Sequence, residues 1–416
     1  MPEPVALYEL ESAMEPLMPS PDRAPLREMA LSIVRKSSAL SGFLHVLTLE
    51  AISKMLSPMN SYYSNSIEGR YSSPVDIDRA MKANFDAEPH KKELQYEGLA
   101  HLKTYSAIRS KMGKGSVNPY DEDFMRDVHR EFYSHIPKEY HKIKTRNGDE
   151  YELIPGEVRK EKEQVMVGNH YGPMASSLPR FLKSFSNRYS SITDPLNRIV
   201  AIAASHHRLA WVHPFLDGNG RVARLISDAL FMMENLDARG LWTISRGLAI
   251  RKENYYAALS NADSVRLNDF DGRGNLSESR LNEFCEFFLS TALDQLSFMT
   301  EMLKLDDLLN RSDRYFELLD SRDVIPNYAG NVFKHVIVNG KVTKGVAYGL
   351  TLKSEHLARK AVRWLINNEF LIEKSLGYNR DELLVNFPLL RSAHLFPGLY
   401  PAKIEAELIQ IPYKKA

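Results

Sequence analysis

The densest group of side chains suited to chemistry lies in residues 213–224, which read HPFLDGNGRVAR. Gly218, Asn219 and Gly220 allow a sharp turn, because glycine adopts positive φ at little cost. The apolar spacing that follows predicts a helix over about residues 221–234. A glycine-rich turn that leads into a helix presents free N–H groups at the positive end of the helix dipole. This segment is therefore predicted to bind an anion such as phosphate.

Four charged or titratable side chains accompany this turn. Arg221 and Arg224 are three residues apart on the first helical turn, and two guanidinium groups favour a polyphosphate over a single carboxylate. Asp217 is suited to hold Mg²⁺ against phosphates, and His213 is suited to accept a proton from an incoming hydroxyl. Each feature alone is common in turns and on solvated helix faces. Their combination in one short segment indicates a functional site.

This segment resembles the Fic family pattern His-x-Phe-x-Asp/Glu-Gly-Asn-Gly-Arg-x-x-Arg and matches it at every fixed position. The resemblance extends over about residues 60–300. It implies a protein adenylyltransferase that uses Mg²⁺ and ATP and transfers AMP to a Ser, Thr or Tyr hydroxyl of a target protein. By this resemblance, His213 would deprotonate the hydroxyl and Asp217 would hold Mg²⁺ on the α- and β-phosphates.

The same resemblance implies roles for the rest of the motif. The backbone of Gly218, Asn219 and Gly220 would stabilise phosphate charge, with the Asn219 side chain contributing. Arg221 and Arg224 would hold the β- and γ-phosphates. Because transfer of this kind depends on positioning and charge stabilisation, this division of roles is physically reasonable.

A second motif lies before the catalytic one. Residues 64–69 fit the family's inhibitory pattern Ser/Thr-x-x-x-Glu-Gly/Asn, with Ser64, Glu68 and Gly69 at the fixed positions. The resemblance implies that Glu68 pairs with Arg224 and blocks productive ATP binding, and that the same glutamate supports removal of AMP in some relatives. Self-modification is also expected from the family. The alternative is that Glu68 is a surface acid at a helix end.

A short strand-rich stretch interrupts the helical pattern. Residues 156–159 and 164–167 predict two short strands, and together they resemble the Fic flap that holds target segments by backbone pairing. The docking residues expected there are Val165, Met166, Val167 and Gly168.

Two stretches after the motif resemble the Fic helices near the nucleotide base. They cover residues 241–245 and 254–259. The second stretch places Tyr255 and Tyr256 among the expected ATP-binding residues.

Helical periodicity surrounds these motifs. Apolar spacing predicts helices over about residues 25–34, 44–55, 74–81, 91–110, 121–132, 178–189, 196–209, 221–234, 251–260 and 277–305. Ser57-Pro58 predicts an interruption after the second helix, and Gly69 predicts a helix stop. The expected fold class is mainly α, a Fic helical bundle with a β-hairpin flap.

The pattern changes after about residue 313. Residues 342–350 and 354–367 predict two helices, and residues 370–373 and 383–385 predict two strands around a turn at 377–379. This order indicates a small C-terminal winged-helix (α+β) domain. We therefore expect three parts: an N-terminal arm and helices with the inhibitory motif (1–115), a Fic catalytic core (116–305) and a winged-helix-like domain (306–416).

The second helix of this C-terminal region is rich in basic residues, and it raises an alternative function. The residues are His356, Arg359, Lys360 and Arg363, with Lys353 just before the helix. They favour DNA contact, whereas nearby glutamates dilute the charge and winged helices also dock proteins or form dimers. The alternative to AMP transfer is therefore a DNA-binding transcriptional regulator with the Fic region as nucleotide sensor. A Fic variant that transfers another phosphate-containing group is disfavoured, because the motif is intact.

The bulk composition sets the remaining expectations. A chain of 416 residues suggests two or three domains. Its net charge of +1 produces no overall positive potential that would attract nucleic acid. The single cysteine, Cys285, is expected to be a buried residue of a helix. There is no basic leader followed by an apolar core and no apolar stretch of membrane-spanning length. We expect a cytoplasmic protein without membrane contact, and a homodimer is plausible.

Overall fold

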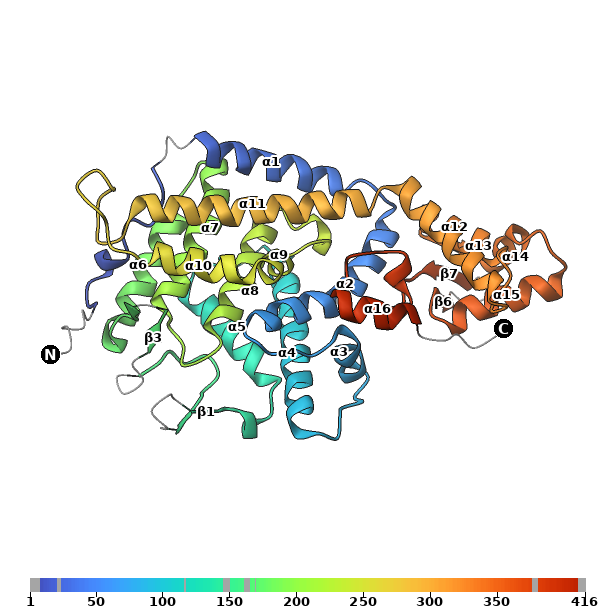
Figure 1. Ribbon diagram of the computed structural model, residues 1–416, viewed down its shortest axis with the longest axis horizontal. Coiled ribbons are helices and arrows are strands. Elements are labelled where there is room, and N and C mark those ends of the chain that lie inside the picture. Colours follow the sequence, from blue (N-terminus) through green and yellow to red (C-terminus); the bar gives the residue numbers. More distant parts are fainter. Residues whose placement is uncertain are drawn as a thin grey trace.

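The computed structural model describes residues 8–20, 24–115, 117–144, 150–160, 165–168, 170–375 and 381–410. The fold is mainly helical, as predicted. Figure 1 shows an elongated molecule in which a large helical body continues into a narrower C-terminal part, drawn in orange and red. Among the described residues, none of the helices combines the length and apolar character needed to cross a bilayer.

The helical body contains the predicted helices, of which the first two extend beyond their predicted ends. They are α1 (Ala24–Leu40), α2 (Val46–Ile67), α3 (Pro74–Met81), α4 (Pro89–Met112), α5 (Glu122–Ser134), α6 (Leu178–Ser190), α7 (Pro195–Val212), α8 (Asn219–Met233), α9 (Ile244–Ile250), α10 (Lys252–Ala262) and α11 (Glu278–Met302). Helix α1 packs along α11, and α7 contacts α1, α6, α8 and α11. Cys285 is buried in α11, which confirms its expected place.

Local signals set the beginnings of the helices that carry the motif and its supports. The Asp194 side chain accepts a hydrogen bond from the Asn197 N–H at 2.8 Å, and Pro195 occupies the first turn of α7. Ser73 caps α3 and Ser277 caps α11 in the same way. Helix α7 is buried on almost every face, so it lies in the centre of the body.

The predicted interruption of the second helix at Pro58 is wrong. Helix α2 continues through Pro58 to Ile67. An internal proline costs a helix about 3 kcal/mol, because one hydrogen bond is lost and the ring crowds the preceding turn. Residues 58–61 and 63–67 are all buried, and this packing outweighs the local cost. The predicted stop at Gly69 is confirmed, since α2 ends at Ile67 and Gly69 has a φ of +76°.

Two short hairpins lie between α5 and α6. Strand β1 (Lys142–Lys144) pairs antiparallel with β2 (Glu150–Glu152), and β3 (Met166–Val167) pairs antiparallel with β4 (His170–Tyr171). The β1–β2 hairpin was not predicted.

The predicted strand at residues 156–159 is wrong. Gly156 has a φ of +82°, and its N–H donates to His129 Nδ1 at 2.8 Å. The Arg159 N–H donates to the Pro214 carbonyl at 2.9 Å. The backbone of this segment is therefore bound to the motif region instead of a neighbouring strand. Of the second predicted strand, residues 166 and 167 form β3, and residue 164 lies outside the described residues.

The C-terminal part combines helices with a three-stranded antiparallel sheet of order β5-β7-β6. Its elements are α12 (Leu305–Ser321), α13 (Ala329–Asn339), β5 (Lys341–Thr343), α14 (Lys344–Leu350), α15 (Glu355–Asn367), β6 (Leu371–Ser375), β7 (Asp381–Val385) and α16 (Ala402–Gln410). The two predicted helices and two predicted strands are present. The first helix begins two residues later than predicted, because Val342 and Thr343 belong to β5. The predicted turn at 377–379 lies outside the described residues, and the winged-helix assignment stays a prediction.

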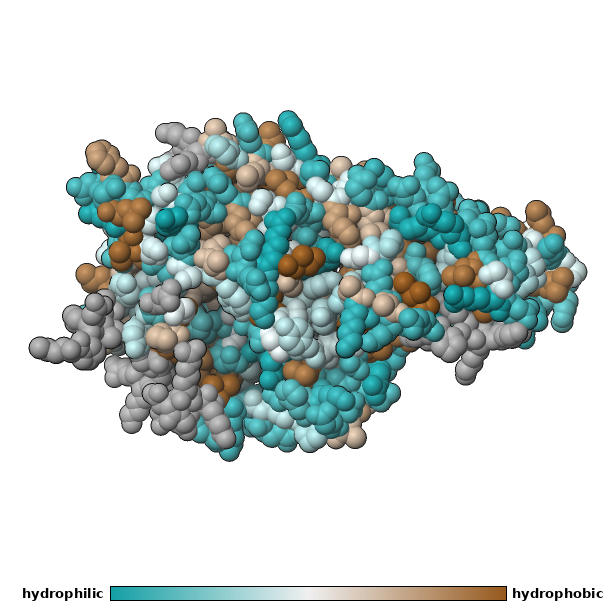
Figure 2. Space-filling model, in the orientation of Figure 1, coloured by the Kyte–Doolittle hydropathy of each residue, from teal (hydrophilic) through white to brown (hydrophobic). Residues whose placement is uncertain are grey.

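Helix α2 contacts both parts of the molecule. The Thr48 hydroxyl donates to the Ile337 carbonyl of α13 at 2.8 Å, and the Tyr63 hydroxyl donates to the Leu399 carbonyl at 3.0 Å. The end of α2 that carries the inhibitory motif reaches the helical body. The face shown in Figure 2 is mainly hydrophilic, with apolar residues scattered over it.

Candidate active site

The motif forms a tight loop between α7 and α8. His213 ends α7 in a left-handed conformation (φ 50°, ψ 61°), and Gly218 precedes α8 with a φ of +79°. The Asn219 side chain spans the loop: its Oδ1 accepts from the Phe215 N–H at 2.9 Å and its Nδ2 donates to the Phe215 carbonyl at 2.7 Å. Both ends of the amide are thus used to shape the loop that turns the N-terminus of α8 toward His213.

Both glycines of the loop are required by close neighbours. A Cβ on Gly218 would lie 2.9 Å from the Tyr133 ring, in addition to the strain of a positive φ. A Cβ on Gly220 would overlap the carboxylate of Glu68. The two glycines therefore place no side chain of their own on the face where an anion would lie. The Glu68 carboxylate occupies that face.

One ring nitrogen of His213 is engaged by the backbone. Its Nδ1 lies 3.2 Å from the Ala210 carbonyl, so we assign the ring proton to Nδ1 and the lone pair to Nε2. Burial lowers the pKa of His213 to about 4. At neutral pH the imidazole is therefore uncharged and able to accept a proton.

Arg159 binds the backbone of His213, a contact that was not predicted from the sequence. Its Nε donates to the His213 carbonyl at 3.0 Å, and its Nη2 donates to the Pro173 carbonyl. The side chain is buried. A guanidinium that binds two carbonyls from different segments fixes the end of α7. No spacing rule indicates Arg159, because it lies 54 residues before His213.

Asp217 has one oxygen fixed and one oxygen available. Its Oδ2 accepts from the Tyr133 hydroxyl at 2.6 Å and from Arg221 Nη2 at 2.7 Å. Both side chains that donate to Asp217 use Oδ2, and the Gly218 N–H is a further donor to the carboxylate. Burial alone would raise the pKa of Asp217, but Arg221 and Tyr133 outweigh it and hold the pKa below its usual value. Asp217 is thus an ionised carboxylate, and its side-chain donors leave Oδ1 available to a further ligand.

His129 also contacts the motif loop at Asp217, and this contact was likewise not predicted from the sequence. Its Nδ1 accepts from the Gly156 N–H, so its Nε2 carries the proton and faces the Asp217 carbonyl at 3.3 Å. Its ring stacks on Phe215 with a centroid distance of 4.1 Å. Burial lowers the pKa of His129 to about 4, so the ring is neutral and acts through hydrogen bonds and stacking.

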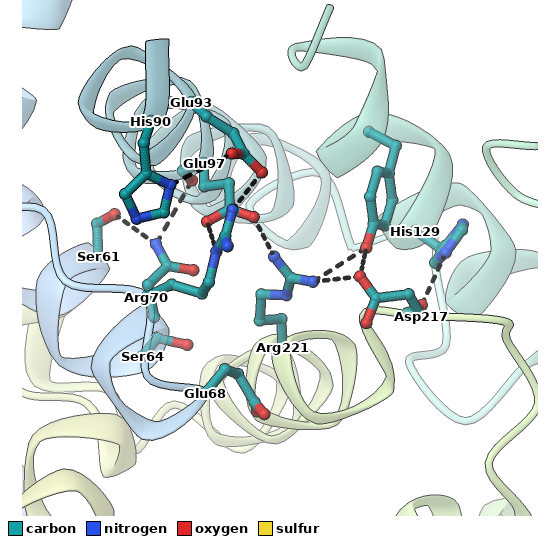
Figure 3. A network of polar contacts seen from close by, with 12 residues as sticks. Ser61, Ser64, Glu68, Arg70, His90, Glu93, Glu97, His129, Asp217 and Arg221 are labelled. Carbon is teal, nitrogen blue, oxygen red and sulfur yellow. Dashed lines mark hydrogen bonds and ion pairs between the residues drawn. The ribbon is translucent and has the colours of Figure 1, made fainter. Parts of the chain in front are cut away.

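Arg221 is buried between two carboxylates. Its Nη2 binds Asp217, and its Nη1 lies 3.2 Å from Glu97 Oε1. Glu97 in turn binds Arg70 Nε through its other oxygen at 2.7 Å. Figure 3 shows this row of alternating charges, which leads from the motif loop across α4 to the segment that follows α2.

Arg224 contacts the predicted inhibitory residues. Its Nη2 lies 2.9 Å from Glu68 Oε1 and 3.0 Å from the Ser64 carbonyl, and its Nε donates to the Ser64 hydroxyl at 3.0 Å. The side chain of Arg224 is only 1% exposed. Ser64 and Glu68 lie one turn apart, so both face the same guanidinium. Gly69 contributes the left-handed turn that follows Glu68.

The two predicted base-binding tyrosines lie beside α2 and the core. Tyr255 is buried, and its hydroxyl lies 2.7 Å from His206 Nε2. The Tyr256 hydroxyl donates to the Ile67 carbonyl at 2.9 Å, and Lys252 Nζ donates to the Ser66 carbonyl at 3.3 Å. Tyr256 and Lys252 therefore hold the last turn of α2. The proposed contact of the two tyrosines with the base stays a prediction.

The motif opens into a cavity of about 470 Å³. Its lining includes seven of the predicted site residues: Glu68, His213, Asp217, Gly218, Asn219, Gly220 and Arg221. The opposite wall comes from α4, the segment after α2 and β1: Arg70, Glu93, Glu97, Tyr140, Lys142 and Ile143. The cavity is thus polar and charged, with the anion-binding loop at one side.

The predicted flap residues form the hairpin β3–β4 and its turn. Met166 is 56% exposed, and Gly168 turns with a φ of +55°. The strand beside them is anchored, because the His170 ring stacks on Trp211 at 5.0 Å and its Nε2 lies 3.1 Å from the Trp211 carbonyl. The hairpin is thereby attached to α7 two residues before His213.

The donor set fits a metal ion held jointly with a nucleotide. No cluster of three or more His, Cys, Asp or Glu ligands occurs within the described part of the chain. Mg²⁺ is commonly bound by one or two carboxylates together with substrate phosphates. The Oδ1 atom of Asp217, beside the anion-binding loop, meets that requirement.

The comparisons with known proteins agree with this geometry. Residues 119–231 match the family model described as Fic/DOC family. A protein of Nematostella vectensis named "Protein adenylyltransferase Fic" is 29% identical over 174 residues, which cover 41% of this chain and 36% of that relative. A protein of the same name from Drosophila willistoni is 40% identical over 81 residues, which cover 18% of this chain and 15% of that relative.

A solved structure of Fic-1 from C. elegans aligns over 68% of this chain and 73% of its own, with a TM-score of 0.51 and 18% identity. That likeness extends to the fold alone. The curated relatives are matched over little more than a third of their length at most. The family match covers α5 through most of α8 and so includes the complete motif: this chain carries a Fic/DOC family domain.

Proposed function

We propose that this protein is a protein adenylyltransferase that moves AMP from Mg-ATP to a hydroxyl of a protein target. The observation that carries the proposal is the motif cavity, where a neutral His213, an ionised Asp217 and an anion-binding helix N-terminus face one space. Relatives that match this region are named protein adenylyltransferase Fic. His213, Asp217, Gly218, Asn219, Gly220, Arg221 and Arg224 are the proposed site residues.

The proposed transfer is a single displacement at the α-phosphorus. The target hydroxyl oxygen forms a bond to the α-phosphorus while the bond between that phosphorus and the bridging α–β oxygen breaks, and pyrophosphate leaves. The hydroxyl proton passes to His213 Nε2. The N–H groups at the start of α8 stabilise the phosphate charge, and Arg224 holds the γ-phosphate once Glu68 has left it.

Asp217 would hold Mg²⁺ through Oδ1, and the bound ion would supply further neutralisation of the phosphate charge. The β3–β4 hairpin, with Val165, Met166, Val167 and Gly168, is the proposed docking edge for the target. Its backbone groups lie close to the motif because His170 anchors the hairpin to α7.

We further propose that Glu68 inhibits this activity. Its ion pair with Arg224 neutralises the guanidinium needed for the γ-phosphate, and its carboxylate lies against Gly220 on the anion-binding face. Charge-assisted hydrogen bonds to a buried arginine are strong enough to compete with a phosphate. The contacts of Tyr256 and Lys252 with the last carbonyls of α2 favour this closed arrangement.

The position of the label in ATP tests the proposed reaction. The Glu68→Gly variant is incubated with ATP labelled on the α-phosphate and, separately, on the γ-phosphate. We expect labelled protein from the first and none from the second, because pyrophosphate is released. Label from the γ-phosphate would show phosphoryl transfer instead, and no label from either, together with tight ATP binding, would favour a nucleotide sensor.

The exposed face of α15 supports a second candidate function, DNA binding. His356, Lys360 and Arg363 are exposed on α15 at helical spacing, so they lie on one face, and the exposed Lys353 lies two residues before this helix begins. Arg359 lies beside them but binds Glu355 at 2.6 Å. Basic side chains gathered in this way can contact a phosphate backbone.

A gel-shift titration over a range of salt concentrations tests this candidate. If four phosphates are contacted, affinity for genomic fragments is expected to fall by about 100-fold between 50 and 200 mM salt. A Lys360→Ala/Arg363→Ala variant should lower the salt dependence, while Arg359→Ala, which removes an already paired charge, should change it less. Absent or salt-insensitive binding would count against DNA as the partner.

A further inference from the structure

A row of alternating charges links Asp217 to the segment after α2. From the motif outward it runs through Arg221, Glu97, Arg70 and Glu93 (Figure 3). The contacts are 2.7 Å for Asp217–Arg221, 3.2 Å for Arg221–Glu97 and 2.7 Å for Glu97–Arg70. Glu97 lies in the middle of the row, and each of its oxygens binds a different arginine.

Glu97 and Arg221 are the most buried members of the row. Their side chains are 10% and 6% exposed, whereas the Asp217 side chain is 41% exposed. A buried ion pair depends strongly on both partners, because a charge left without its partner has no water to replace the lost contact. The Arg221 guanidinium is also stacked over the ring of Phe132 at 5.0 Å.

The direction of each contact matters for Asp217. Glu97 holds Arg221 by Nη1, so Nη2 points to Asp217 Oδ2 and to the Tyr133 hydroxyl, at 2.7 and 3.0 Å. The Oδ2 atom of Asp217 is thereby bound by both Arg221 and Tyr133. The other oxygen is left for the cavity. Rotation of Arg221 would release this arrangement, and Glu97 is the contact that opposes such a rotation.

We propose that Glu97 is a positioning residue for Asp217, acting through Arg221, and that Arg70 in turn fixes Glu97. The proposal rests on the proposed function, in which Asp217 holds Mg²⁺. Residues that orient metal ligands from behind usually change metal affinity by 10- to 100-fold when they are replaced. Glu97 belongs to neither the catalytic nor the inhibitory motif, and it reaches Arg221 from 124 residues away.

The test measures Mg²⁺ dependence separately from nucleotide binding. All variants carry Glu68→Gly, and calorimetry gives the ATP dissociation constant in EDTA and at increasing Mg²⁺ concentrations. Glu97→Gln keeps the shape of the side chain but turns an N–H group toward one of the two arginines. We expect it to raise the Mg²⁺ concentration for half-maximal effect by about 10-fold and to leave ATP binding in EDTA unchanged.

Matched variants identify the cause. Glu88→Gln, at the start of α4, pairs with the exposed Lys91 and does not line the motif cavity, so it should leave the Mg²⁺ dependence unchanged. Asp217→Asn should abolish the Mg²⁺ effect, and adding Glu97→Gln to it should cause no further loss. Arg70→Gln should shift the Mg²⁺ dependence in the same direction as Glu97→Gln, by less, and it decides the question if Glu97→Gln does not fold.

Three outcomes would overturn the proposal. Glu97→Gln and Glu88→Gln could have the same Mg²⁺ dependence. Glu97→Gln could weaken ATP binding equally with and without Mg²⁺, which would show a structural role alone. Asp217→Asn could leave the Mg²⁺ dependence intact, which would also refute the metal assignment in the proposed function. The first two results leave that function standing, so the two failures are distinguishable.

Discussion

Replacement of Glu68 by glycine is expected to raise transfer of AMP to protein by about 10- to 100-fold, the range that corresponds to losing a hydrogen bond between charged groups. The variant frees Arg224, which is buried and has its charge compensated by Glu68 at 2.9 Å. It also clears the space above Gly220, where the carboxylate lies against the anion-binding loop. Arg224 keeps its two contacts with Ser64, so the guanidinium stays in place for a phosphate.

The measurement is incorporation of label from ATP labelled on the α-phosphate, with wild type and variant side by side. No target is required if the protein modifies itself, as expected from the family. Glu68→Gln is the informative companion, because it removes the charge but keeps the side-chain volume over Gly220, and we expect an intermediate rate. If Glu68→Gly binds ATP yet labels no faster than wild type, the inhibitory role of Glu68 is wrong.

Loss of the proposed base should have the second large effect. In the Glu68→Gly background, His213→Ala is expected to slow transfer by about 10²- to 10⁴-fold, the usual contribution of a general base. ATP affinity should change little, because in the proposed reaction His213 Nε2 accepts the hydroxyl proton and binds no phosphate. The effect therefore belongs to the rate of the chemical step and not to binding.

Two variants separate the base from the backbone it sits on. His213 adopts a left-handed conformation, which asparagine tolerates better than alanine. His213→Asn thus preserves the loop while removing the base, and it should be as slow as His213→Ala. His356→Ala, on the exposed face of α15, is the control and should transfer AMP at the parent rate. Undiminished transfer by both variants at position 213 would refute the role of His213.

Much of the site was determined by local sequence. Residues 213–224 form one loop and one helical turn, so their types and spacing bring His213, Asp217 and the glycines together without help from distant segments. Ser64 lies in the last turn of α2 and Glu68 follows as its C-cap, so both face Arg224; the sequence pattern had predicted this contact for Glu68. The main helices were predicted for the same reason, since their apolar spacing is a property of each segment alone.

Other features were decided by tertiary structure. Glu97, Tyr133 and Arg159 reach the motif from 124, 84 and 54 residues away in the contacts they make. No local pattern marks them, because their roles depend on which helices pack together. Burial by tertiary contacts is also the reason that α2 continues as a helix past Pro58. Backbone hydrogen bonds attach residues 156–159 to α5 and the motif loop, so these residues do not pair as a strand. The sequence by itself determined which groups form the anion-binding loop, whereas tertiary packing decided which buried charges hold that loop in place, because a buried charge is stable only where distant elements supply its partner.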